Sequence, residues 1–462
     1  MTTLPPTAPD LRQALERICA PQRVLTRPIE RIAFASDASF YRLIPQAVVQ
    51  PESLAEIQAL FALSRNRRIP LTIRAGGTSL SGQAISDGLL IDVARHWRAV
   101  TPLDGGTRVR VQPGAIGAYV NALLRPHGTK LGPDPASIGS AMMGGILANN
   151  ASGMCCGVVH NSYHTLESLT FVLPSGLIID SAASDAEARF HAGAPQLAAG
   201  LLRLRARILA DPALVQRIRG KYQRKNTTGY SLNALLDHPR AVELFAHLLI
   251  GSEGTLAFIA EAVLRTIPDQ PHKRTAMLYF RSMRSAAEAV PALAALGAAA
   301  VELMDRAALR AVEGHAGVPA TIATLGPAAA ALRIEFHGRS PALVDAPVDA
   351  ARSLLLGLDL ELPAAFTADP QLQAGYWKIR KGMFPSVGAV RARGTSVILE
   401  DLAVPVERLA DCIGDLQRLF VEHGYHDAII FGHAKDGNLH FVVSQSFAEA
   451  TEIERYRRCI AE

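Results

Sequence analysis

The segment RAGGTSLSG, residues 74–82, lies between two apolar runs, residues 69–73 and 89–93, that are typical of β-strands. A Walker loop would carry a lysine and lead into a helix, and a Rossmann loop would also open a helix; this segment does neither. What remains is a run of successive backbone N–H groups with the hydroxyls of Thr78 and Ser79, which can surround an anion such as a pyrophosphate. The alternative, judged on this segment alone, is an ordinary glycine-rich turn between two strands.

Two further segments are rich in small residues. Residues 132–153 read GPDPASIGSAMMGGILANNASG, and residues 250–259 read IGSEGTLAFI. Few packed cores tolerate so many positions without a large side chain, whereas a backbone that approaches a flat, extended ligand needs such residues. The three segments together therefore favour a ligand-binding region over a set of unrelated turns.

Length, charge and cysteine usage restrict the class of protein and the compartment that the chain fits. At 462 residues the chain is long enough for two or three hydrophobic cores. Its 47 basic and 42 acidic residues are spread without blocks, which does not favour nucleic acid but suits an anionic ligand, a peripheral membrane contact or simply a mildly basic surface. The five cysteines form no CxxC pair, and we find no signal peptide or membrane-spanning apolar run. We therefore expect a soluble, cytoplasmic protein with at most peripheral contact on the inner face of the membrane.

The pattern of predicted elements changes near residue 270. Residues 1–44 predict a helical segment. Residues 45–268 alternate strands with helices, with one helix predicted over residues 54–67, and include a basic, helical insertion from about residue 182 to 240. Residues 269–462 alternate strands with long helices, which predicts an antiparallel sheet with helices on one face. The fold class expected from this order is α+β.

The three small-residue segments together resemble the FAD-binding domain of the vanillyl-alcohol oxidase family, the para-cresol methylhydroxylase (PCMH) type. The resemblance implies that the first segment wraps the pyrophosphate of FAD, that the second passes the flavin and the adenosine ribose, and that backbone near Ile259 reaches the isoalloxazine and adenine. Thr78 stands where members with covalent FAD often carry a histidine, so non-covalent FAD is expected. The cofactor-binding residues implied in this way are Arg74, Gly76, Gly77, Thr78, Ser79, Gly82, Gln83, Pro133, Asp134, Ser137, Gly139, Gly144, Gly145, Asn149, Ala151, Ser152, Gly153 and Ile259.

Two histidines stand close together in the second half of the chain, in GHAKDGNLHF. His433 and His440 are joined by an Asp-Gly-Asn turn, which predicts a hairpin with the histidines on neighbouring strands. Imidazole pairs of this kind commonly bind zinc or manganese together with a carboxylate. The alternative is a hairpin in which both histidines are merely satisfied by hydrogen bonds.

This segment resembles the GHxGDGNLH signature of the flavin-linked D-2-hydroxyacid dehydrogenases, which include D-lactate, glycolate-oxidase-type and D-2-hydroxyglutarate enzymes. The resemblance implies that His433 and His440 bind a divalent metal that holds the substrate. Arg380, in YWKIRKG, matches the arginine that binds the substrate carboxylate, and a guanidinium suits this role because it grips a carboxylate bidentately. Ala434 and Lys435 resemble the branch fused to an iron–sulfur part. Residues 225–230 (KNTTGY) also resemble a family stretch near the active site, without an assignable role.

In that family a Glu-His pair follows the helix predicted from residue 448 onward, as third metal ligand and catalytic base. No such pair stands before Glu462, so the catalytic base is unknown. We expect the 462 residues to be the front part of a longer protein or a truncated one, with poor turnover by itself.

The resemblances imply FAD-dependent oxidation of a D-2-hydroxy acid to the 2-oxo acid, with electrons passed to a quinone, a cytochrome or an iron–sulfur acceptor. Two alternatives stay open. One is a non-catalytic flavin-binding subunit or a truncated relic, and the other is a metal-dependent hydrolase without flavin.

Overall fold

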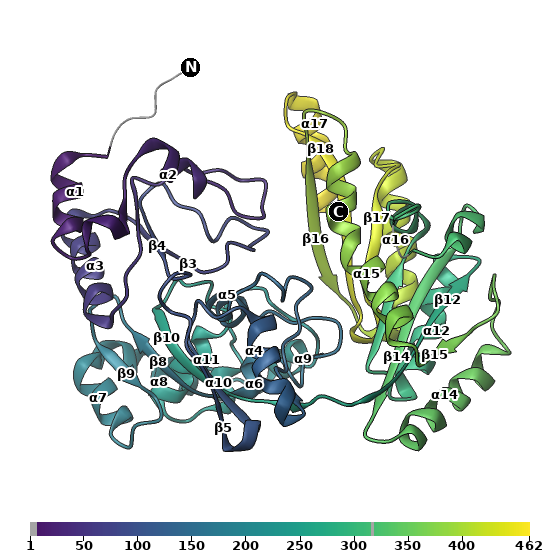
Figure 1. Cartoon of the computed structure of the whole chain (residues 1–462), viewed down its shortest axis with the longest axis horizontal. Coiled ribbons are helices and arrows are strands. Elements are labelled where there is room, and N and C mark those ends of the chain that lie inside the picture. Colours follow the sequence, from purple (N-terminus) through teal and green to yellow (C-terminus); the bar gives the residue numbers. More distant parts are fainter. Residues whose placement is uncertain (1–6, 316–317) are drawn as a thin grey trace. The chain divides into compact units, whose positions relative to one another are not determined.

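The computed structural model describes residues 7–315 and 318–462, with the side chains of all these residues except 381 and 383–390. The chain divides into two compact units, Met1–Asp269 and Gln270–Glu462 (Figure 1). Each unit has hydrophobic cores of its own.

The first unit begins with a small, mostly parallel sheet of order β1-β2-β4-β3. Its strands are β1 (Val24–Leu25), β2 (Ala47–Val49), β3 (Leu71–Arg74) and β4 (Leu89–Asp92). Helix α3 (Leu54–Arg67) connects β2 to β3; its N-cap Ser53 accepts the N–H of Glu56, and it ends at Arg68 in the left-handed conformation. The structure confirms the sequence-based helix at 54–67 and the two strands flanking the segment RAGGTSLSG. The N-terminal helices are α1 (Pro9–Glu16) and α2 (Pro28–Ala33).

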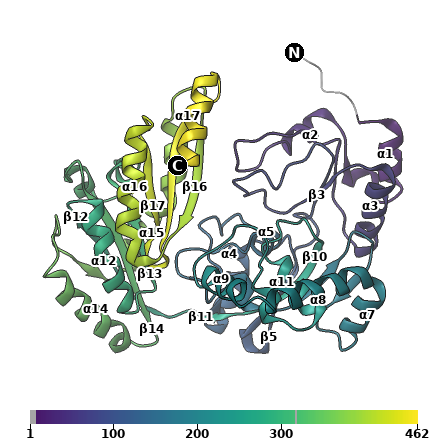
Figure 2. The ribbon, with the colours of Figure 1, turned by 180° about the vertical axis from the view of Figure 1, so that it is seen from behind.

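A second, fully antiparallel sheet of order β5-β6-β10-β8-β9 forms the rest of the first unit. Helices pack on it through a large apolar core, and Figure 2 shows α8 and α11 among them. The strands are β5 (Val100–Leu103), β6 (Arg108–Val111), β8 (Leu166–Val172), β9 (Ile178–Asp180) and β10 (Phe258–Arg265), with the short pair β7 (Thr129–Lys130) and β11 (Ile267–Pro268). The helices are α4 (Gly117–Leu124), α5 (Met143–Asn149), α6 (Ser162–Thr165), α7 (Ala186–Gly193), α8 (Pro195–Leu209), α9 (Pro212–Tyr222), α10 (Ala234–Asp237) and α11 (Ala241–Leu249), so the basic insertion is helical as expected.

Two histidine rings are stacked in this unit, that of His247 on α11 and that of His238 at the end of α10. The rings of His238 and His247 are 3.7 Å apart at 23°. Burial lowers the pKa of both imidazoles, and that of His247 to about 4 from an ordinary 6.5. Between these values the unfolded chain binds more protons than the folded one, so stability is lost as the pH falls from about 6.5 to about 4.

We expect the free energy of unfolding of the first unit to fall by roughly 2–3 kcal/mol in this window because of His247 alone. Chemical denaturation of wild type and His247→Gln at pH 7 and pH 4.5 measures it, since the difference between the two proteins isolates this residue from the carboxylates. An equal acid sensitivity of both proteins would contradict the assignment.

The second unit contains a seven-stranded antiparallel sheet of order β15-β12-β14-β13-β17-β18-β16. Helices α12, α14 and α16 pack on one face, as the sequence pattern predicted. The strands are β12 (His272–Phe280), β13 (Ala300–Met304), β14 (Ala330–Gly338), β15 (Phe366–Thr367), β16 (Thr395–Ala403), β17 (Ile429–His433) and β18 (Asn438–Ser446). The helices are α12 (Met283–Ala295), α13 (Arg306–Arg310), α14 (Pro341–Leu355), α15 (Pro370–Val390), α16 (Leu409–Glu422) and α17 (Ala450–Ala461).

Helices α13 and α15 also pack on the opposite face of the sheet, which the sequence pattern did not predict. On the opposite face, Leu309 of α13 and Ile379 of α15 pack with Met277, Met304 and Phe431 of the sheet. The central strand β13 is buried at every position, so both faces of the sheet need cover. This second face carries the polar side chains described below.

Candidate functional site

The structure shows that Arg74, expected from the sequence to bind the anion, also holds the loop together. Its Nη1 donates to the carbonyl oxygens of Ser36 (2.9 Å) and Ala84 (3.1 Å), which closes the loop after β3. Gly77 turns at a φ of +64°, and a Cβ there would lie 2.4 Å from Nη2 of Arg74. Burial also lowers the pKa of Arg74. Arg74 therefore braces the loop from within, and only glycine fits at position 77.

Other residues of the first segment also serve the shape of the loop. The hydroxyl of Ser79 accepts the N–H of Ser81 (3.2 Å) and of Gln83 (3.3 Å). Gly82, with a φ of +81°, lies against the ring of Tyr41. Since Ser79, Gly82 and Gln83 are occupied in this way, what the loop offers a ligand is backbone N–H groups and the half-buried Thr78.

The structure brings the three small-residue segments together. A Cβ on Gly76 would lie 2.7 Å from the carbonyl oxygen of Ser140, so the first segment touches the second. The N–H groups of Gly251 and Glu253 donate to the carbonyl oxygens of Leu147 (3.1 Å) and Ala148 (2.8 Å), which joins the third segment to α5. Ile259 is buried on β10, next to this junction in sequence.

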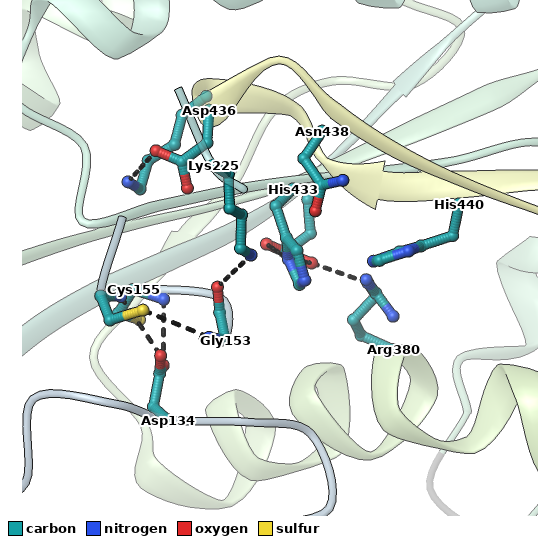
Figure 3. Close-up of polar contacts among 12 residues, drawn as sticks. Asp134, Gly153, Cys155, Lys225, Arg380, His433, Asp436, Asn438 and His440 are labelled. Atoms are coloured by element: carbon teal, nitrogen blue, oxygen red, sulfur yellow. Dashed lines mark hydrogen bonds and ion pairs between the residues drawn. The ribbon is translucent and has the colours of Figure 1, made fainter. Parts of the chain in front are cut away.

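Asp134 and Gly153, both expected from the sequence to bind the cofactor, bring the two ends of the second segment into contact. The carboxylate of Asp134 accepts the N–H of Cys155 (2.9 Å) and of Cys156 (3.2 Å), and burial raises its pKa (Figure 3). Gly153 passes so close that a Cβ would overlap the backbone of Asp134, and its carbonyl accepts Lys225 Nζ at 2.9 Å. Lys225 thus has a structural role that the sequence did not reveal. Pro133, next to Asp134 in the sequence, is buried.

The remaining positions form an open backbone surface that fits a flat cofactor. Cβ atoms on Gly139 and Gly145 would meet nothing within 4 Å. The hydroxyl of Ser152 is buried without a hydrogen-bond partner among the described residues, a state that costs free energy unless a ligand satisfies it. Asn149 donates to Glu253 (2.7 Å) at the edge of this surface. Ser137 is exposed on the same segment and Ala151 is half-buried next to Ser152. The residues present therefore fit FAD, held mainly by backbone.

The neighbouring glycines Gly144 and Gly145 allow cofactor binding to be separated from folding. We expect Gly145→Val to fold like wild type and to bind FAD at least about 100-fold more weakly, because its side chain would fill open space over the backbone. Gly144→Val should instead destabilise the fold by about 1–3 kcal/mol, because its Cβ would lie 2.8 Å from Pro113. FAD titration and thermal unfolding of the two apoproteins provide the measurements, and wild-type FAD affinity in Gly145→Val would refute the assignment of this surface.

In the second unit a buried carboxylate links two of the expected site residues. Glu302, on β13, is fully buried, and its Oε1 and Oε2 lie 2.9 and 3.0 Å from Nδ1 of His433. Its Oε2 also accepts Nε–H of Arg380 at 2.7 Å. Glu302 and His433 are register partners on β13 and β17, whereas Arg380 comes from α15. The guanidinium also lies 4.7 Å from the ring centre of Phe431.

His440 stands beside His433 with a second carboxylate behind it. The two rings are perpendicular with centroids 5.0 Å apart. Nδ1 of His440 lies 2.9 Å from Oδ1 of Asp401, at ion-pair distance but without hydrogen-bond geometry. Asn438 donates to the same Oδ1 at 2.6 Å. Each histidine therefore has a carboxylate at Nδ1, which leaves Nε2 as the atom that can bind a metal.

Neither Glu302 nor Asp401 was among the site residues expected from the sequence. The one available signal for Glu302 was an acidic residue within the apolar strand AVELM, and nothing local connects that strand to the hairpin of His433. His433, His440 and Arg380 are brought to one face of the sheet, as Figure 3 shows.

Comparisons with known proteins support the expected cofactor and fold. Residues 45–182 match the family described as FAD binding domain, and residues 269–462 match FAD linked oxidases, C-terminal domain. The chain is 26% identical to a D-2-hydroxyglutarate dehydrogenase of Haemophilus influenzae over 94% of its own length and 44% of that protein. It is 28% identical to the glycolate oxidase subunit GlcD of Escherichia coli, over 90% of this chain and 72% of that protein. It is 24% identical to D-lactate dehydrogenase [cytochrome] 1 of Saccharomyces cerevisiae, over 86% of this chain and 60% of that protein. The chain thus spans less than half the length of the dehydrogenase from Haemophilus.

Two solved structures share the fold at low identity. An alkyldihydroxyacetonephosphate synthase superposes with a TM-score of 0.70 at 17% identity, covering 100% of this chain and 80% of the other. p-Cresol methylhydroxylase with substrate bound superposes with a TM-score of 0.67 at 13% identity, covering 98% of this chain and 85% of the other. The α+β class with a PCMH-type FAD-binding domain is therefore confirmed. Among the helices of the described ranges, none has the length and apolarity to cross a bilayer.

Proposed function

The chain belongs to the FAD-linked oxidases, and from this premise we propose that it oxidises a D-2-hydroxy acid to the 2-oxo acid. The observation that carries the proposal lies in the second unit, where a hairpin and α15 bring two histidines and an arginine to one face of the sheet. The names of the relatives support the substrate class, since they act on hydroxyglutarate, glycolate or lactate.

The roles follow from the chemistry of the side chains. Bound FAD would supply the acceptor for the hydride that leaves C2, and a zinc or manganese ion on the two histidines would lower the pKa of the substrate hydroxyl. His433 and His440 would hold that ion through Nε2. Arg380 would bind the substrate carboxylate with its terminal nitrogens, because Glu302 takes its Nε edge. The hydroxyl proton passes to a base that the described residues do not identify.

Turnover also requires an electron acceptor, which we propose to be a quinone, a cytochrome or an iron–sulfur protein or domain. The name of the yeast relative includes a cytochrome, which supports this class. We also propose a cytoplasmic location with at most peripheral membrane contact. The five cysteines, all among the described residues, form no disulfide, which supports a reducing compartment.

Anaerobic reduction tests the proposal. The purified chain should be yellow, and D-lactate or D-2-hydroxyglutarate should bleach its flavin band while the L-enantiomers do not; glycolate tests the smallest substrate. A yellow protein that no hydroxy acid bleaches would support the non-catalytic flavin subunit instead. A colourless protein that does not take up added FAD would overturn the proposal in favour of a flavin-free metalloenzyme.

A further inference from the structure

Glu302 is a fully buried side chain that contacts both His433 and Arg380. We propose that it is the positioning residue of the site, which fixes the tautomer of His433 and the orientation of Arg380 at the same time. The roles of these two partners rest on the proposed function, but the contacts that Glu302 makes do not.

The surroundings of Glu302 show why it is firmly held. It occupies the middle of the central strand β13, where its register partners are Arg333 on one side and His433 on the other. A fully buried carboxylate is costly unless charged or hydrogen-bonded groups compensate it. Here an imidazole N–H and a guanidinium N–H both point at it, from two separate elements. A group placed on a rigid strand orients its partners better than one placed on a loop.

The first consequence concerns the proton of His433. An ionised carboxylate only accepts hydrogen bonds, so the neutral imidazole must carry its proton on Nδ1, which faces Glu302. The lone pair then stands on Nε2, the form that a metal ligand requires. Without Glu302 the ring would be free to place its proton on either nitrogen and to rotate.

The second consequence concerns the guanidinium of Arg380. The group is planar and its donors have fixed directions, so a bond from Nε to Glu302 also sets the direction of the two terminal nitrogens. The same carboxylate therefore orients the group expected to bind the metal and the group expected to bind the substrate.

Asp401 is a weaker candidate for such a role. Its side chain is 54% exposed, and its contact with His440 lacks hydrogen-bond geometry. An exposed carboxylate also loses much of its effect to solvent screening. The stronger constraint in this site thus comes from Glu302.

Glu302→Gln removes the charge at nearly constant size, and the amide oxygen can satisfy only one of the two donors well. We expect the affinity for added Zn²⁺ or Mn²⁺ to fall about 10–100-fold, with FAD affinity unchanged. Glu302→Asp keeps an acceptor carboxylate, so its metal affinity should fall less than that of Glu302→Gln. The matched control is Asp305→Asn, which changes a buried carboxylate at the end of the same strand that accepts backbone N–H groups of Ala308 and Ile430.

Nitrogen-15 NMR of the histidine rings in the metal-free protein gives a readout independent of activity. His433 should show the Nδ1–H tautomer in wild type and in Glu302→Asp, and a mixture in Glu302→Gln. A wild-type Nε2–H tautomer, or a loss of metal affinity no larger than in Asp305→Asn, would overturn the proposal. If wild type binds no metal and oxidises no hydroxy acid, the proposed function fails, while the tautomer still decides the role of Glu302.

Discussion

Alanine at His433 or at His440 is expected to weaken the binding of added zinc or manganese while leaving FAD in place. The two rings lie perpendicular with centroids 5.0 Å apart, and neither can hold an ion alone with comparable affinity. The FAD surface belongs to residues of the first unit, so its contacts are unchanged. We expect metal affinity to fall at least about 100-fold, and oxidation of the hydroxy acid to fall about 10³-fold, because a metal supplies several kcal/mol of charge stabilisation.

Metal analysis and the flavin absorbance of the same samples give both quantities. His426→Ala is a matched control, because it removes an exposed histidine of the same unit. Unchanged metal content in both His433→Ala and His440→Ala would reduce the hairpin to a structural feature, the alternative that its sequence leaves open.

The parts of the fold and site that could be predicted from the sequence are those determined by residues close together in the chain. The helix at 54–67 follows from its N-cap Ser53 and its apolar spacing, and the structure has it at those residues. The hairpin of His433 and His440 follows from an Asp-Gly-Asn turn between two apolar runs, and β17 and β18 pair as expected. The glycine-rich segments follow from composition, because few other environments need so many small residues.

What could not be predicted depends on pairing between distant strands. Glu302 reaches His433 only because β13 pairs with β17, about 130 residues later in the chain. Strand β16 likewise brings Asp401 to His440 across an edge of the sheet. The bracing contacts of Asp134 and Arg74 were missed for another reason. Residues in a ligand-binding loop can either touch the ligand or brace the loop, and only the hydrogen-bond partners distinguish these roles.

Replacement of Arg380 should affect both substrate binding and stability, and two substitutions separate the effects. Arg380→Lys keeps a cation near Glu302 but loses the planar fork, so the expected result is a nearly unchanged melting temperature and a kcat/KM lowered about 10²-fold. Arg380→Met removes the cation altogether. It leaves a fully buried carboxylate without one of its partners, a change that typically costs about 3–5 kcal/mol.

The double variant Arg380→Met/Glu302→Gln decides whether that cost arises from the pair. An amide in place of the carboxylate leaves no uncompensated charge, so part of the stability lost in Arg380→Met should return, even though two residues are now changed. A double-mutant cycle compares the free energies of unfolding of wild type, both single variants and the double variant, measured with denaturant. We expect a coupling free energy of at least about 1 kcal/mol, because the two groups are in direct contact. Strictly additive losses would show that the 2.7 Å contact between Arg380 and Glu302 contributes nothing to stability. The orientation of Arg380 would then have to come from α15 and Phe431 instead.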